Sequence, residues 1–88
     1  MIKKGTGMLE INIHNAVMGS NEFKKVPLSW TISSLRNFFA KVYKIPVAMQ
    51  KLEIKINEES PAEEITEDHK TISFYNVTET STFIISMR

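Results

Sequence analysis

The chain has 88 residues and a net charge of +1, with 42% hydrophobic and 24% charged residues. This length accommodates one hydrophobic core, and the composition excludes a disordered chain or a fibrous repeat. No apolar run approaches the roughly 18 residues that span a membrane, and the absence of cysteine fits a reducing compartment. We expect a flexible lead over residues 1–7, one domain over residues 8–88, and a cytoplasmic location.

The charged side chains are unevenly distributed along the chain. Residues 1–55 carry nine basic and three acidic side chains, giving +6, whereas residues 56–88 carry two basic and seven acidic side chains, giving −5. Such polarity can orient a domain toward a charged protein partner. The basic residues are too few, and too little interleaved with aromatic residues, to indicate a nucleic-acid partner.

A hairpin is predicted at the start of the domain. Residues 8–14 alternate between apolar and polar side chains, and a turn cluster around Gly19 separates them from a second strand over residues 22–26. Phe23 and Val26 lie three residues apart, which breaks strict alternation. This interval indicates a bulge in the second strand or an early end to it.

The spacing changes to a helical period after the hairpin and predicts a helix over residues 32–44. Thr31 precedes it as an N-cap, and Pro46 prevents its continuation. Four apolar residues define the face that we expect to pack on the sheet: Ile32, Leu35, Phe39 and Val42.

Two further strands are predicted after the helix. Residues 51–56 alternate cleanly, with Leu52, Ile54 and Ile56 directed inward, and residues 82–87 form the last strand. The chain between these strands is expected to consist of an acidic loop over residues 57–68, in which Ile65 is an anchor on a very short strand, and a compact turn over residues 71–77.

The sequence lacks the patterns that are typical of catalytic or metal-binding residues. His14 and His69 are far apart in the chain, and the acidic run over residues 58–68 lacks the alternating ligands and the glycine of a calcium loop. The glycines do not form a phosphate-binding loop. We therefore expect a protein without catalytic residues, bound metal or cofactor.

Trp30 is the one residue whose position the predicted elements do not explain. It lies just before the helix, where its ring can pack onto Leu35 or Phe38, or lie exposed as a contact for a partner. Of these alternatives, we expect packing.

Several short motifs coincide in order and spacing with those of one family. They are Thr31-Ile32, Ile45-Pro46, Gln50-Lys51-Leu52, Thr71-Ile72-Ser73, Tyr75-Asn76-Val77 and Ser81-Thr82. On these motifs, residues 8–88 resemble the ubiquitin-like domains. The resemblance implies an α+β fold of the β-grasp type, in which a mixed sheet in ββαββ order has one helix packed across it. It also implies that Tyr75 lies in the turn before the last strand.

Within that family, the chain resembles the ubiquitin-like domains of the tubulin-folding cofactors, cofactor E first and cofactor B second. The residues that carry this resemblance are 26–32, 44–47, 72–77 and 84–88. It implies a non-catalytic protein-interaction module that acts in folding, assembly or dissociation of the tubulin dimer. The partners that it implies are tubulin, other tubulin-folding cofactors, or both, bound by a monomeric domain associated with the cytoskeleton.

The sequence also departs from ubiquitin where ubiquitin meets its partners. Ubiquitin presents an apolar patch centred on an isoleucine, and the matching positions here hold Glu53, Ile84 and Ser86. Burying a carboxylate at such a centre is costly, so ordinary ubiquitin readers should bind poorly. The sequence ends at Arg88 without a diglycine, so we do not expect a conjugated modifier. An alternative function, an adaptor that docks to the proteasome or to ubiquitin receptors, requires the apolar patch.

The surface expected to bind a partner is the outward face of the strands over residues 51–56 and 82–87, because it matches the docking face that the resemblance implies. It comprises Lys51, Glu53, Lys55, Ile84, Ser86 and Arg88.

Overall fold

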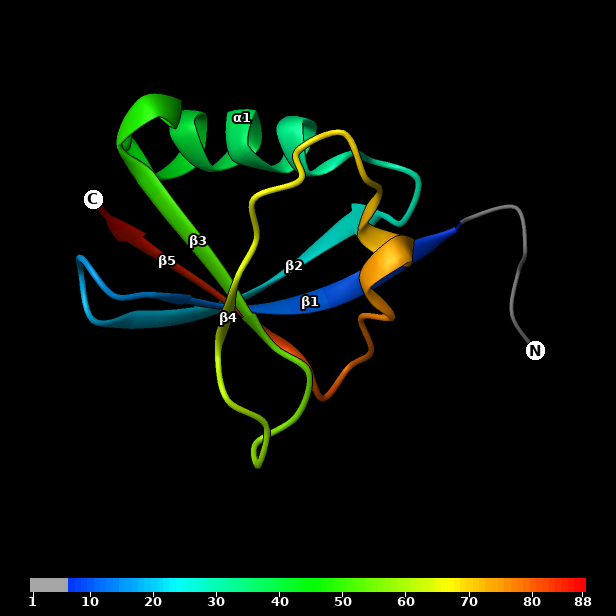
Figure 1. Ribbon diagram of the computed structural model, residues 1–88. Helices are drawn as coiled ribbons and strands as arrows, with labels where there is room; N and C mark the ends of the chain where they lie inside the picture. The colour runs from blue at the N-terminus through cyan, green and yellow to red at the C-terminus, as the bar shows by residue number, and fades with distance from the viewer. Residues whose placement is uncertain (1–6) are drawn as a thin grey trace.

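One helix packs across one face of a five-stranded sheet in the computed structural model, which describes residues 7–88 (Figure 1). Apart from Gly7, the lead predicted over residues 1–7 lies outside the described residues. The elements are, in chain order, β1 (Met8–Asn15), β2 (Ser20–Pro27), α1 (Ile32–Tyr43), the 3₁₀ helix η1 (Val47–Met49), β3 (Gln50–Lys55), β4 (Glu63–Glu64), the 3₁₀ helix η2 (Ile72–Tyr75) and β5 (Thr82–Met87).

The sheet has the strand order β2-β1-β5-β3-β4. β1 and β5 pair in parallel at its centre, whereas the β1–β2, β3–β5 and β3–β4 pairs are antiparallel. This arrangement confirms the mixed sheet and the single crossing helix that the sequence resemblance implied. Among the described residues, no helix is both long and apolar enough to cross a membrane.

The hairpin differs from its predicted form. β1 and β2 pair without interruption along their whole lengths, so the predicted bulge or early strand end is wrong. Val26 is buried, whereas Phe23 lies on the opposite face and is 63% exposed. On the helix side of β2, the carboxylate of Glu22 accepts a hydrogen bond from the hydroxyl of Tyr43. β2 is an edge strand, where inward-pointing charged side chains are common, and this explains how regular pairing coexists with the irregular apolar pattern.

α1 begins at the N-cap that the sequence predicts, and it ends one residue before the predicted end. Thr31 Oγ1 accepts a hydrogen bond from the backbone N–H of Ser34 at 3.1 Å, which satisfies a donor of the first turn. The helix ends at Tyr43, one residue before the predicted end, because Lys44 adopts a left-handed conformation with φ of 62°. Pro46 then lies outside the helix, as expected.

The buried face of α1 was predicted correctly at three of four positions. Ile32, Leu35 and Phe39 are fully buried, but Val42 is 37% exposed and was wrongly placed on this face. Tyr43, four residues after Phe39, occupies the inward position instead, and the two rings lie 5.7 Å apart. An interval of four residues continues the stripe at this point, whereas an interval of three turns Val42 outward.

A buried arginine connects α1 to the chain around β3 and β4, and sequence reasoning did not find it. Arg36 is 5% exposed, and its guanidinium donates to Asp68 Oδ1 at 3.0 Å, to the carbonyl of Ile65 at 2.8 Å and to that of Gln50 at 3.3 Å. In return, Gln50 Nε2 donates to the carbonyls of Arg36 and Ile45. This network fixes the long loop against the helix. Ile65 is buried as predicted, but it follows the two-residue strand β4 and is not part of it.

The strands that carry the predicted site form largely as expected. In β3, Leu52 and Ile54 are buried, but the strand ends at Lys55 and Ile56 is 37% exposed, so its predicted inward orientation is wrong. The chain turns away from the core at that point. β5 has its predicted bounds, and η2 is the compact turn expected before it, with Tyr75 at its end.

Candidate functional site

The predicted partner-binding residues of β3 and β5 lie side by side on the sheet face that points away from α1. The antiparallel register places Lys51 opposite Ser86, and Glu53 opposite Ile84. Lys55 lies farther along β3 on the same face, and all five side chains are half-buried. The residues that alternate with these five along the two strands are buried in the core. Successive side chains of a strand point to opposite faces, so the five side chains point outward. We call these five residues and Arg88 the β3–β5 face.

Arg88 closes one end of the β3–β5 face. Its guanidinium pairs with Glu64 Oε2 at 2.7 Å, and its backbone N–H donates to the carbonyl of Met49 at 2.9 Å. Glu64 of β4 lies directly opposite Glu53 of β3. Two carboxylates at such a pair of positions repel each other, and the charge of Arg88 offsets that repulsion. Sequence reasoning missed Glu64, because the pairing of a two-residue strand leaves no periodic signal.

The charges of the β3–β5 face are mixed, and its apolar content is small. Lys51 and Lys55 make no ion pair with any of residues 7–88, whereas Arg88 is paired. Ile84 is the one large apolar side chain of the face, and it stands beside the carboxylate of Glu53. The face can therefore offer two free ammonium groups to a partner, but it presents no continuous apolar patch.

Exposed apolar side chains gather instead at the end of the sheet where β5 finishes. Backbone hydrogen bonds join Ala16 to Ile85, and Arg88 to Met49, so the β1–β2 turn, η1 and the end of β5 share this end of the molecule (Figure 1). The exposed side chains on these three segments are Val17, Met18, Val47, Met49 and Met87. The Val17-Met18 pair in an otherwise polar turn was the sequence signal that could have indicated them.

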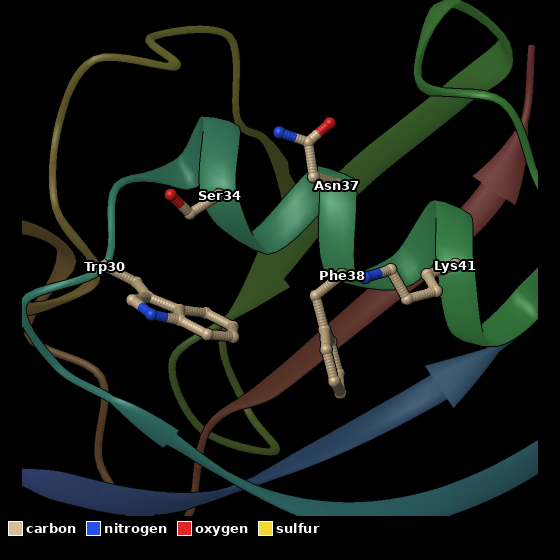
Figure 2. A pocket seen from close by; sticks show the side chains of 5 residues that line it. All are labelled: Trp30, Ser34, Asn37, Phe38 and Lys41. Atoms are coloured by element: carbon tan, nitrogen blue, oxygen red, sulfur yellow. The ribbon is translucent and has the colours of Figure 1, made fainter.

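A hollow lies along the flank of α1, as Figure 2 shows. The half-buried ring of Trp30 packs against that of Phe38, with centroids 5.7 Å apart, which confirms the predicted packing of Trp30. The hollow has a volume of about 300 Å³ and is lined by Trp30, Ser34, Asn37, Phe38 and Lys41.

The histidines do not come together. His14 lies on β1, where its Nδ1 and Asn21 Oδ1 are 3.0 Å apart, and His69 is exposed in the loop before η2. Residues 7–88 contain no group of three or more histidine, aspartate or glutamate side chains that could hold a metal ion.

Two tyrosines have altered acidity. Burial, together with the hydrogen bond and the charge of Glu22, raises the pKa of Tyr43 to about 12. Burial and the charges of Glu67 and Asp68 raise the pKa of Tyr75. Both phenols are protonated at neutral pH, and the hydroxyl of Tyr43 donates a hydrogen bond to Glu22.

Comparison with known proteins identifies the family. The model of the ubiquitin-like domain family matches residues 8–85, nearly the whole of the described chain. The chain belongs to the ubiquitin-like domain family. No curated protein sequence gives a significant match.

Several solved structures share the fold of this ubiquitin-like domain. The C-terminal ubiquitin-like domain of mouse tubulin-specific chaperone e superposes with a TM-score of 0.84 at 17% identity, covering 98% of this chain and 92% of that one. Trypanosoma brucei tubulin-binding cofactor B gives 0.78 at 12% identity, covering 91% and 94%. The UBL domain of Plasmodium falciparum Dsk2 gives 0.69 at 15% identity, covering 92% and 99%. These likenesses establish the ubiquitin-like fold, which also fits the sequence motifs that first indicated it.

Proposed function

We propose that this ubiquitin-like domain is a non-catalytic interaction module of a tubulin-folding cofactor, acting in the cytoplasm in folding, assembly or dissociation of the tubulin dimer. The observation that carries the proposal is the likeness in fold to the domains of tubulin-specific chaperone e and tubulin-binding cofactor B, over more than nine tenths of this chain. The sequence motifs over residues 26–32 and 72–77 point to the same group of domains independently of the superposition.

The β3–β5 face is the proposed contact surface. Its backbone is held rigidly by pairing on both sides of β3 and β5, so its side chains are presented in fixed register. Lys51 and Lys55 form no ion pair within residues 7–88 and can meet carboxylates of a partner. Charged contacts of this kind speed association and select the partner more than they add affinity. An acidic surface of tubulin or of another cofactor is the partner chemistry that fits.

A binding assay with purified proteins tests the proposal. The domain is immobilised, and αβ-tubulin dimer and a ubiquitin-binding domain are titrated over it separately. We expect saturable binding of tubulin and no measurable binding of the ubiquitin reader. If tubulin does not bind alone, the assay is repeated with the other tubulin-folding cofactors present, and failure under both conditions contradicts the proposal.

The alternative function is an adaptor that docks to the proteasome or to ubiquitin receptors. The likeness in fold to the UBL domain of Dsk2 supports this alternative. Such docking needs an apolar centre, and here Glu53 stands beside Ile84 at that place. Binding of the ubiquitin reader with a Kd of about 100 μM or tighter, lost on Ile84→Ala, would favour the adaptor over the tubulin module.

A further inference from the structure

The flank of α1 carries a second surface that the β3–β5 face does not include. The rings of Trp30 and Phe38 lie side by side below α1, and Ser34 and Asn37 of the helix complete the lining of the hollow, with the Asn37 side chain directed away from the Phe38 ring (Figure 2). This hollow lies on the helix side of the sheet, whereas the β3–β5 face lies on the other side. One partner segment could therefore occupy each surface at the same time.

The size and lining of the hollow suit a single large apolar side chain. A volume of about 300 Å³ is at the lower end of the range for small-ligand sites. Tryptophan at the centre of such a pocket contributes strongly to binding, because a large and rigid surface is desolvated at little cost in conformational entropy. The Asn37 side chain is exposed and forms no hydrogen bond with any of residues 7–88, so its amide is available to a partner backbone.

The charge around the hollow selects the neighbours of that apolar side chain. Lys41 is the one ionisable residue among its lining residues, and it forms no ion pair within the described part of the chain. Of the two basic residues of α1, Arg36 is buried and paired with Asp68, so Lys41 carries the free positive charge of the helix. The helix contains no acidic residue, Lys44 at its C-cap is exposed, and Lys24 and Glu22 of β2 neutralise each other at 3.5 Å. The positive potential at this flank is thus uncompensated, and it complements carboxylates.

We propose that the hollow formed by Trp30, Phe38 and Lys41 is a docking site for an acidic peptide segment that inserts one aromatic or large aliphatic side chain. The apolar side chain packs on the two rings, and an adjacent carboxylate pairs with Lys41. This site is independent of the proposed tubulin contact, since no residue of the β3–β5 face lines it.

Trp30 is the only tryptophan of the chain, so its fluorescence reports directly on the hollow. The probe is the blocked peptide Gly-Asp-Asp-Phe-Asp-Asp-Gly, titrated into the whole domain. We expect a saturable shift in the emission of Trp30, and a weakening of the affinity by about tenfold in Phe38→Ala and by about fivefold in Lys41→Glu. The matched controls are Val42→Ala and Lys44→Glu, which change exposed residues of the same helix region that do not line the hollow. Both controls should bind as the unmodified domain does.

Each other outcome overturns the proposal in a distinct way. Equal weakening by Lys41→Glu and Lys44→Glu would mean general charge attraction, and an unchanged affinity for the peptide with alanine in place of phenylalanine would mean that the rings are not used. Absence of any shift of the Trp30 emission and of its indole N–H resonance at about 1 mM peptide would remove the site. Concentration-dependent dimerisation that Phe38→Ala abolishes would assign the hollow to a second copy of the chain. Lys41→Glu changes an exposed side chain, so it still tests the proposal if Phe38→Ala fails to fold.

Discussion

Replacing Arg36 with alanine should destabilise the domain more than any surface substitution. The substitution removes the donor that the carbonyls of Gln50 and Ile65 use, in a region where Arg36 is 5% exposed. Each buried carbonyl left without a donor costs about 1–3 kcal/mol, and loss of the buried arginine stem adds a cavity. We therefore expect the free energy of unfolding to fall by about 3–5 kcal/mol, out of about 4–13 kcal/mol for a domain of this size.

Urea denaturation measures this loss through the midpoint and the slope of the transition. The stability of Arg36→Lys should lie between those of the unmodified domain and Arg36→Ala. The lysine ammonium group keeps the charge beside Asp68 but cannot reproduce three donors in a planar fork. Lys41→Ala on the exposed side of the same helix is the control and should change stability by less than about 0.5 kcal/mol. A loss below about 1 kcal/mol in Arg36→Ala, with an unchanged slope, would refute the structural role of the network.

Three further predictions follow from the packing, the acidity and the face. Phe39→Ala should lower the free energy of unfolding by about 3–5 kcal/mol, because it leaves a cavity at a fully buried position. An unchanged melting temperature would mean that the core face of α1 is wrongly assigned. The pKa of Tyr43 is raised to about 12, so the stability that this residue contributes is complete below its unfolded pKa near 10 and is lost as pH rises through about 12. The melting temperature of Tyr43→Phe should therefore fall less steeply between about pH 10 and pH 12 than that of the unmodified domain. Parallel falls in the two melting temperatures would contradict this. Glu53→Ile should bring the binding of a ubiquitin-binding domain into the measurable range, at a Kd of about 100 μM or tighter, and no binding in a titration would show that Glu53 is not what excludes ubiquitin readers.

The helix and the strands could be predicted from the sequence wherever the spacing of apolar residues matches the pattern of buried residues. The apolar run over residues 82–87 and the cap at Thr31 gave correct boundaries because each depends on adjacent residues. Prediction was wrong at Phe23 and Val42, where the side chain is apolar but exposed. An apolar residue at the surface has no local signature that distinguishes it from a core residue, so only the three-dimensional packing decides between them.

The candidate site was predictable as a set of outward positions, but its internal contacts were not. Which residue of β5 lies opposite Glu53 depends on the register between distant strands, and the ion pair of Arg88 with Glu64 depends on a strand of two residues. Arg36 was missed because a charged residue on a helix is usually exposed, and its burial follows from acceptors supplied by the loop and by β3. Long-range contacts of this kind leave no trace in the spacing of residues along the chain.

The proposed function depends above all on whether tubulin contacts the β3–β5 face through the free ammonium groups of Lys51 and Lys55. Binding of αβ-tubulin is measured for the unmodified domain, for Lys51→Glu, and for Lys44→Glu as a charge-matched control outside the face, at low salt and at physiological salt. We predict affinity that falls as salt rises and that falls by about a further tenfold in Lys51→Glu alone. Affinity that is independent of salt, or that Lys51→Glu and Lys44→Glu reduce equally, would contradict the assignment of this face.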